Sequence, residues 1–190
     1  MKSGLTSYLC SCKWVKIVVS RSVRPSGAEN VPELIGFSDG SLAAYACGVY
    51  VRWKLQKVPD VDPDRFAVKL ICSKARVAPV RGITAPRSEM SGFLILTSLL
   101  KVVDNSMDPK PTRITIATDS QCTISAVEKS GGTLAPYFAS RVSESMNNLA
   151  EIDENIIIDP VLHVPGSQNP ADIPTHANTT PDEVREGSVW

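Results

Sequence analysis

The chain has 190 residues, of which 43% are hydrophobic, and its 20 Lys and Arg residues balance 20 Asp and Glu residues. This composition is typical of a globular domain with a substantial core, and it excludes collagen-like and wholly disordered chains. The apolar runs are far shorter than the roughly 18 residues of a transmembrane helix, and the start does not resemble a secretory signal. We therefore expect an intracellular, cytoplasmic protein without a membrane partner. With zero net charge, any contact with phosphate must be local.

The first predicted elements form a β-meander. Alternating apolar residues and turn residues predict a strand over 34–39, a turn at Gly40-Ser41 and a return strand over 47–51. A third apolar run, over 66–72, follows a loop rich in Pro and Asp, and predicts the third strand. Residues 1–33 show no comparable pattern, so we interpret them as a linker or the tail of a preceding domain.

Helices alternate with strands in the middle of the chain. Apolar residues recur at spacings of three and four from Phe93 to Val103, which predicts a helix that begins near Pro86. Residues 113–118 predict a strand. Ser120 then has the chemistry of a helix N-cap, so a second helix follows directly.

The last third of the chain continues this alternation. The second helix is expected to stop at Gly131-Gly132, and a third helix spans 136–149. A β-rich run over 156–164 precedes a short helix that opens at Asn169-Pro170. This order favours the α/β class, with a mixed sheet and helices on its faces.

Two carboxylates lie where apolar side chains are expected. Period-two alternation places Asp39 on the same apolar face of its strand as Ile35 and Phe37. Glu89 precedes Phe93 by four residues and therefore lies on the buried stripe of its helix. Both positions are unusual for solvated charges.

Two further carboxylates follow in the second half of the chain. Asp119 ends the strand over 113–118, at the carboxyl edge where open α/β sheets place their sites, and Asp172 falls in the first turn of the last helix. Each carboxylate alone is compatible with a turn, a cap or a helix-dipole partner. Together they would repel, by about 4 kcal/mol per pair at 4 Å and an effective dielectric near 20, unless protonated or neutralised by a cation. A hard divalent cation such as Mg²⁺ is the expected ligand.

Several short motifs surround these carboxylates. They are FSDGS at 37–41, SKARVAP at 73–79, PRSEM at 86–90, TDSQ at 118–121, PYFASRV at 136–142 and HVPGSQNPAD at 163–172. In this order and spacing they make residues 34–190 resemble the type 1 ribonuclease H domain of retroelement polymerases. More narrowly, they resemble the Bel-Pao class of LTR retrotransposons.

The resemblance implies a ribonuclease H-like fold with a five-stranded mixed sheet, three antiparallel strands followed by parallel ones, and flanking helices. It also implies that the RNA strand of an RNA/DNA hybrid is hydrolysed with two Mg²⁺ ions, for which Mn²⁺ can substitute. The ions would be bound by Asp39, Glu89, Asp119 and Asp172. Two such ions, roughly 3.5 to 4 Å apart, activate a water and stabilise the leaving oxygen.

The same resemblance suggests residues that contact the hybrid. The candidates are Gly40, Ser41, Arg87, Ser120 and Gln121. Basic residues that could follow hybrid phosphates are Lys74, Arg76, Arg81, Arg87 and Arg141. His163 and Ser167 are candidate auxiliary residues, because many enzymes of this type carry a histidine shortly before the last aspartate. Gly40 stands where the class more often has alanine, and we expect the turn to accept either residue.

The resemblance also suggests how the chain is organised. Residues 1–33 would be a linker or the tail of a polymerase region, 34–178 the ribonuclease H-like domain, and 179–190 an extension toward a missing downstream domain. The expected partners are an RNA/DNA hybrid and, within one polyprotein, a reverse transcriptase and an integrase, in the cytoplasm or in retroelement particles.

Two other functions remain open. The domain could be an inactive ribonuclease H-like module that binds nucleic acid or protein. An integrase or transposase of the same fold is less favoured, because those enzymes place the glutamate last, whereas the order here is Asp, Glu, Asp, Asp.

Overall fold

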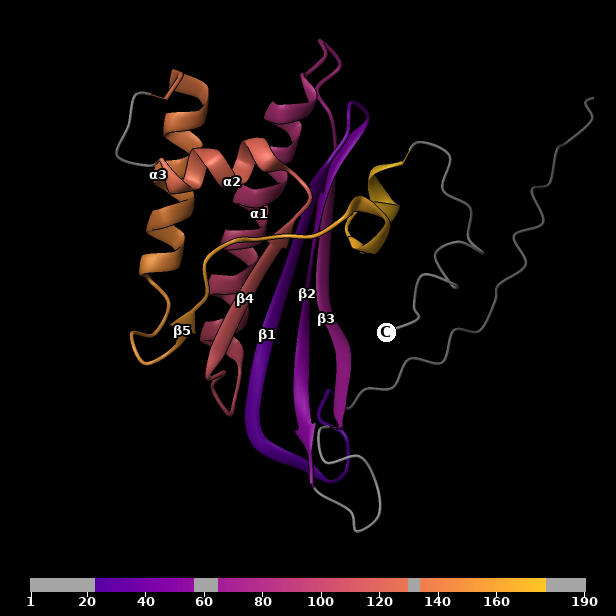
Figure 1. Cartoon of the computed structure of the whole chain (residues 1–190), viewed down its shortest axis with the longest axis vertical. Helices are drawn as coiled ribbons and strands as arrows, with labels where there is room; N and C mark the ends of the chain where they lie inside the picture. Colours follow the sequence, from indigo (N-terminus) through magenta and orange to yellow (C-terminus); the bar gives the residue numbers. More distant parts are fainter. Residues whose placement is uncertain (1–22, 57–64, 130–133, 177–190) are drawn as a thin grey trace, which may run out of the picture.

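Three long antiparallel strands form one side of the sheet in the computed structural model, which describes residues 23–56, 65–129 and 134–176 (Figure 1). These strands are β1 (Ala28–Gly40), β2 (Ala44–Leu55) and β3 (Phe66–Val77). β2 pairs with both neighbours, and a short loop closes the hairpin between β1 and β2 through a hydrogen bond from the Ser41 amide to the Ala44 carbonyl, at 2.8 Å.

The parallel part of the sheet lies on the other side of β1. β4 (Arg113–Thr118) pairs in parallel with β1, and β5 (Ile157–Ile158) and β6 (Leu162–His163) each pair in parallel with β4. The order is β3-β2-β1-β4-β5, with β6 continuing the β5 position along β4. This arrangement confirms the predicted mixed sheet, whose fifth position is divided between two short pieces.

The three α-helices of the described residues lie on one side of the sheet (Figure 1). They are α1 (Ala85–Ser106), α2 (Gln121–Glu128) and α3 (Pro136–Ala150). α1 contacts β1 and β2, and α3 packs against α1. Two short 3₁₀ helices, η1 (Gly166–Gln168) and η2 (Ile173–Thr175), lie on the side of the sheet away from α1 (Figure 1).

Apolar side chains between the sheet and α1 form the core. Leu34 and Val51 from the sheet, and Phe93 and Leu96 from α1, are completely buried. A Cβ atom at Gly36 would lie 2.8 Å from a methyl group of Leu96, so the absence of a side chain there lets α1 lie close to β1. Each buried residue of this size contributes roughly 1.5 to 3 kcal/mol, and this interface therefore fixes α1, with Glu89 at its start, against the sheet.

The strands are longer than the sequence pattern predicts. β1 begins at Ala28 rather than Leu34, and its pairing with β2 shifts register between Ala28 and Pro32. Because proline cannot donate to the ladder, it interrupts the pattern that alternation detects. β3 continues to Val77 rather than stopping at Cys72, because its last residues are exposed on an edge strand and need not be apolar.

The helix predicted to open at Asn169-Pro170 does not form. η1 and η2 take its place, and Asp172 is the residue before η2 rather than part of an α-helix. Pro174 explains the difference, because it lacks the amide that an α-helix would need there. By contrast, α1, β4 and α3 lie where the pattern predicts them.

The predicted division of the chain at 33 and 178 stays a prediction. Residues 1–22 and 177–190, and the stop expected at Gly131-Gly132, lie outside the described residues. None of the helices in the described part of the chain combines the length and apolarity needed to cross a lipid bilayer.

Candidate active site

Two of the predicted carboxylates emerge side by side from adjacent parallel strands. Ser38 of β1 is directly in register with Thr118 of β4. Asp39 and Asp119 each follow one of these residues, so both reach the carboxyl edge of the sheet at the same level. The register of a single strand pair therefore places two acidic groups together.

Asp39 is the most buried of the four carboxylates, with 6% of its surface exposed. Its Oδ2 atom accepts a hydrogen bond from the Thr175 hydroxyl of η2. The pKa of Asp39 is raised to about 6, mainly by burial and to a smaller extent by the charges of Asp119 and Asp172, against the lowering effect of the Thr175 hydrogen bond. The carboxylates of Asp119 and Asp172 therefore lie close enough to Asp39 to act on it electrostatically.

Asp39 lies on the predicted face of β1, together with Ile35 and Phe37. The Cβ positions of Gly36 and Gly40 are directed toward α1, so the face that carries Asp39 is the one away from α1. Both faces of the central strand β1 carry apolar residues, and alternation alone does not show which of them the helix covers. Thr175 of η2, rather than the core under α1, covers Asp39.

Two glycines let the start of α1 touch the end of β1. A Cβ atom at Gly40 would lie 2.3 Å from the backbone nitrogen of Glu89 and 2.3 Å from the carbonyl carbon of Ser88. A Cβ atom at Gly92 would lie 2.4 Å from the Asp39 carbonyl oxygen. The expectation that alanine would fit at Gly40 is therefore wrong, because the obstacle is helix backbone rather than turn conformation.

Ser120 connects Glu89 to the end of β4. Its Oγ atom accepts a hydrogen bond from the Thr123 amide at 3.1 Å, as the N-cap of α2, and donates to Glu89 Oε2 at 2.6 Å. The predicted cap is confirmed. Because Ser120 directly follows Asp119, the same hydroxyl holds the Glu89 carboxylate near the end of β4.

Asp172 is placed by the turn that begins at Asn169. The Asn169 side-chain amide donates to the Ser38 carbonyl at 3.0 Å and to Asp119 Oδ1 at 3.3 Å, and the Asn169 carbonyl accepts from the Asp172 amide at 3.0 Å. Asp172 Oδ2 also forms a hydrogen bond with His176 Nε2, at 2.9 Å. One buried asparagine thus fixes the Asp172 turn to both β1 and Asp119.

As the side chains lie, no group of three or more His, Cys, Asp or Glu residues within the described ranges is arranged to hold a metal ion. Each carboxylate is bonded to a protein donor instead, and these donors are Thr175, Ser120, Asn169 and His176. The donor chemistry nevertheless suits Mg²⁺, which prefers carboxylate oxygens and completes its shell with water and phosphate. A cation would also relieve the repulsion that acts on Asp39.

The residues suggested as hybrid contacts divide into two groups. The hydroxyl groups of Ser41 and Ser120 are engaged within the protein; Ser41 Oγ donates to the Thr175 carbonyl at 2.7 Å. Gln121 and Arg87 are exposed. Gln121 lines a hollow of about 390 Å³ that follows α2 as far as Lys129, beside Pro86 of α1 and Phe138 of α3. Gln121 and Arg87 therefore remain the more accessible candidates.

The two auxiliary candidates, His163 and Ser167, lie beside the end of β4 that carries Asp119. His163 is on β6, directly in register with Thr118, and is exposed. Ser167 is exposed on η1, whose first residue, Gly166, approaches Asp119 so closely that a Cβ atom would lie 3.1 Å from Oδ2. β6 and η1 therefore bring these residues near the end of β4 that carries Asp119, and their roles stay predictions.

Thr175 and Asn169 are site residues that sequence reasoning missed. Thr175 bonds Asp39 across 136 positions, so no local pattern could reveal it. The sequence pattern predicts Asn169 only as the start of a helix. Its place before Pro170 is instead typical of an Asx turn, in which its Oδ1 atom accepts from the Ala171 amide at 3.2 Å. That signal was available in the sequence.

Comparison with solved structures finds several ribonuclease H domains at low similarity. RNase H1 from Halobacterium salinarum NRC-1 is 14% identical over 73% of this chain and 90% of its own, with a TM-score of 0.47. The N-terminal RNase H domain of rv2228c from Mycobacterium tuberculosis is 11% identical over 82% of this chain and 95% of its own, with a TM-score of 0.49. LC11-RNase H1 in complex with an RNA/DNA hybrid is 9% identical over 73% and 88%, with a TM-score of 0.45. Likenesses at this level add nothing to the assignment.

No curated protein matches the chain. A family match is decisive, because the family described as Pao retrotransposon-like RNaseH-like domain covers residues 1–120, more than half of the sequence. The matched part contains Asp39, Glu89 and Asp119, whereas Asp172 lies beyond it. Together with the mixed sheet and its helices, this match confirms the fold and the resemblance drawn from the motifs: the chain belongs to the Pao retrotransposon-like RNaseH-like domain family.

Proposed function

We propose that this domain is a Mg²⁺-dependent endoribonuclease that hydrolyses the RNA strand of RNA/DNA hybrids, as part of a retroelement polyprotein with a reverse transcriptase and an integrase. Its family consists of ribonuclease H-like domains, so the class of function is nucleic-acid binding or nuclease activity. One observation carries the finer proposal. Asp39 is buried at the end of β1, and Asp119 and Asp172 are close enough to raise its pKa. Such a cluster is unfavourable without a cation.

The residues that would hold the ions are Asp39, Glu89, Asp119 and Asp172, with Mn²⁺ as a substitute for Mg²⁺. Bound Mg²⁺ would lower the pKa of an attacking water and stabilise the leaving oxygen. The chain supplies the positions of the ligands. Thr175, Ser120 and Asn169 orient Asp39, Glu89 and Asp119, respectively. Burial raises the pKa of Asp39, and a bound cation would favour the ionised form of this carboxyl group.

The substrate would approach over exposed residues beside this cluster. Gln121 begins α2 next to Ser120, and Arg87 lies two residues before Glu89 on α1. His163 and Ser167 would lie at the opposite rim, near the strand end that carries Asp119. The 2′-hydroxyl of RNA is the group that would distinguish the cleaved strand from DNA.

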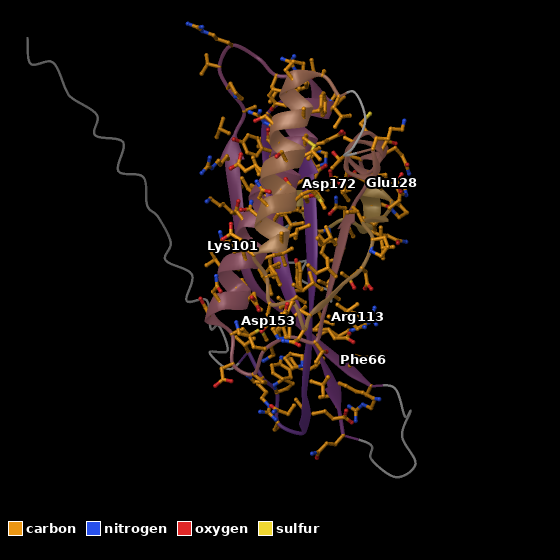
Figure 2. The ribbon with its side chains drawn as sticks, turned by 90° about the vertical axis from the view of Figure 1, so that its left-hand side faces the viewer. Phe66, Lys101, Arg113, Glu128, Asp153 and Asp172 are labelled. Atoms are coloured by element: carbon orange, nitrogen blue, oxygen red, sulfur yellow. The ribbon has the colours of Figure 1, made fainter. Side chains whose placement is uncertain are left out.

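Cleavage of a labelled RNA/DNA hybrid with Mg²⁺ or Mn²⁺ tests this proposal, with duplex DNA and single-stranded RNA as substrate controls. Asp39→Asn should lower the rate by about 100-fold or more, because it removes a metal ligand. Asp153→Asn is the matched control. It makes the same change far from the site (Figure 2), where Asp153 accepts from the Asn155 amide at 2.9 Å. Full activity of Asp39→Asn would contradict the proposal.

A second function is favoured by the hydrogen bonds that the carboxylates make. Each is bonded to a protein donor, and no three acidic groups within the described residues are arranged around a metal position. The domain could therefore be an inactive module that binds nucleic acid. Hybrid binding that is equal in EDTA and in Mg²⁺, without cleavage at high protein concentration, would establish this alternative.

A further inference from the structure

An apolar groove of about 500 Å³ lies beside the end of α1. It is lined by side chains of β2, β3 and the last turns of α1, among them Trp53, Leu99 and Val102. α1 packs against β1 and β2, whereas Ile71 and Cys72 of the edge strand β3 also line the groove and are only partly buried. The groove therefore lies where the sheet extends beyond the helix that covers it.

This groove is separate from the carboxylate cluster. Glu89 lies near the start of α1, and Ser106, which lines the groove, is its last residue. At 1.5 Å per helical residue the two are about 25 Å apart along the axis. α1 runs from the site end toward the opposite end of the molecule (Figure 1). The groove is thus a feature of its own, and its occupant need not be the substrate.

The lining of the groove indicates the chemistry of an occupant. Val102 has 58% of its surface exposed and Val23 has 38%, so apolar side chains are left uncovered. Trp53 is buried, but its indole Nε1 has no hydrogen-bond acceptor among the described residues. A buried donor without an acceptor is unfavourable. A peptide segment fits both features, because it brings apolar side chains and a carbonyl oxygen with every residue.

The chain itself leads away from this groove at its N-terminal side. Val23 and Arg24 both line it, and the guanidinium carbon of Arg24 lies 5.5 Å from the centroid of the Trp53 ring. Residues 1–22 precede Val23 directly. Four extended residues span up to about 14 Å, so residue 19 and those before it have the reach to enter the groove.

Residues 14–19, with the sequence WVKIVV, are the most apolar run in this part of the chain. In an extended segment Val15, Ile17 and Val19 share one side, and Lys16 lies on the other. The family match begins at residue 1, so these residues belong to the same family domain as the groove. A charged residue on one side and three apolar residues on the other suit a segment that covers an apolar surface.

We propose that residues 14–19 dock in the groove at the end of α1 of the same molecule. Val15, Ile17 and Val19 cover the apolar lining, and a main-chain carbonyl accepts the Trp53 indole N–H. Docking makes these residues part of the domain rather than of a linker, and it anchors the chain before β1 at the end away from the carboxylates. The proposal is independent of nuclease activity.

Photo-crosslinking on the full chain tests this proposal. p-Benzoylphenylalanine replaces Val102, which is exposed in the groove, and the irradiated protein is digested and analysed by mass spectrometry. Crosslinks to residues 14–19 are expected. Ser106 is also exposed and also lines the groove, so it provides a second probe position if the bulky side chain at 102 fills the groove.

Ile157 is the matched control position for the probe. It is as exposed as Val102, with 55% of its surface accessible, but it lies on β5, at the other edge of the sheet from β3. The same probe in place of Ile157 should give no crosslink to residues 14–19. Equal crosslinking from Ile157 would overturn the proposal, because the segment would then contact the surface without preference.

A second comparison changes the segment instead of the groove. Val15→Asp, Ile17→Asp and Val19→Asp combined should lower the crosslink from position 102 about tenfold, because carboxylates are costly to bury in an apolar groove. The control Thr6→Asp, Ser7→Asp and Ser11→Asp adds the same charge outside residues 14–19 and should leave the crosslink unchanged. Circular dichroism checks that all variants are folded. An unchanged crosslink in the first variant would overturn the proposal.

The remaining outcomes identify other occupants. Absence of crosslinks to residues 14–19 from both probe positions would overturn the proposal, and so would crosslinks to a different part of the chain. Mixing ¹⁵N-labelled and unlabelled protein before irradiation separates the two origins of the segment. Crosslinks that join labelled to unlabelled peptides would assign the groove to a second copy of the chain and overturn docking within one molecule.

Discussion

The two ends of the sheet differ in whether their acidic side chains are paired with basic ones. At the end where β4 begins, carboxylates are paired with cations: Glu33 with Arg52, Asp159 with Arg113 and Asp104 with Lys110. At the end where β1 and β4 finish, no Lys or Arg of the described residues pairs with Asp39, Glu89, Asp119 or Asp172. Arg113 and Asp172 mark these two ends in Figure 2.

Under the proposed function, this difference separates charges that stabilise the structure from charges that bind a ligand. Asp159 shows the first kind, because it bonds both Arg113 and the Thr115 hydroxyl, the latter at 2.8 Å. Asp39 shows the second kind, because burial and like charges raise its pKa and no cation offsets them. Arg87 and Arg141, which lie over the ring of Tyr137, are positive charges that likewise have no ion-pair partner among the described residues. The ionised form of Asp39 therefore lowers the stability of the end where β1 and β4 finish, and the metal ion of the proposed function would restore that stability.

The largest effect is expected from a substitution at Gly40, where the end of β1 contacts the start of α1. Gly40→Ala should destabilise the protein by about 3 kcal/mol, because the new methyl group would meet the backbone of Ser88 and Glu89 at 2.3 Å and α1 would have to shift. Chemical denaturation measures this change. The same shift would move Glu89, so hybrid cleavage should fall even in the fraction that remains folded.

Gly48→Ala is the control for this substitution. A Cβ atom at Gly48 would lie 3.3 Å from the edge of the Tyr50 ring, which is a side chain that can move. Its effect on the free energy of unfolding should therefore be clearly smaller. Equal losses at the two positions would show that the close approach of α1 to β1 is not the cause.

The second prediction concerns the pH dependence of stability. Asp39 has a pKa of about 6 in the fold, against 3.8 ordinarily, so its ionised form opposes folding above pH 6 and this cost disappears as the pH falls toward 4. Asp39→Asn should stabilise the metal-free protein by about 2 kcal/mol above pH 7, because solvent screens part of the shift and asparagine keeps part of the Thr175 hydrogen bond.

Urea denaturation of both proteins in EDTA, from pH 4 to pH 8, checks this prediction. The difference between them should shrink as the pH falls, and Mg²⁺ should raise the stability of the native protein more than that of Asp39→Asn. A variant that is less stable than the native protein at every pH would show that Asp39 is a structural residue, like the paired acids at the other end.

Much of the fold and part of the site follow from the sequence, because both depend on local patterns. The period of three and four in α1 and the Ser120 cap predict elements that the structure confirms. Those patterns also place Asp39 and Asp119 at the ends of their strands, and the two ends meet at one edge because β1 and β4 are parallel neighbours in the sheet. What local patterns cannot show is which face of a central strand the helix covers, and Asp39 is on the face away from α1.

Contacts across long separations explain the rest. Thr175 reaches Asp39, and Tyr137 reaches Arg87 across 50 positions, so neither pair leaves a trace at helix or strand spacing. Gly40 is a similar case. Its turn conformation does not require glycine, and only the packing of α1 against it does.

The third prediction concerns the Ser120 hydroxyl, which caps α2 and also donates a hydrogen bond to the Glu89 carboxylate. Ser120→Ala should destabilise the protein by about 1 kcal/mol, because α2 loses its cap, and it should free the Glu89 carboxylate from its 2.6 Å hydrogen bond. Thermal denaturation measures the first effect, and the concentration of Mg²⁺ needed for half-maximal cleavage measures the second. Ser125→Ala, within α2, should change neither. A normal metal requirement in Ser120→Ala would show that Ser120 serves only the helix.

The smallest effect is expected at the paired end of the sheet. Glu33 and Arg52 are partly exposed, with 26% and 37% of their side-chain surfaces accessible, so their ion pair should contribute no more than about 0.5 kcal/mol. A double-mutant cycle with Glu33→Gln and Arg52→Gln measures this coupling. Hybrid binding should be the same in all four proteins, because these charges already neutralise each other. A coupling energy as large as the pH-dependent cost at Asp39 would mean that pairing at this end stabilises the sheet as strongly as the unpaired acids at the other end destabilise it.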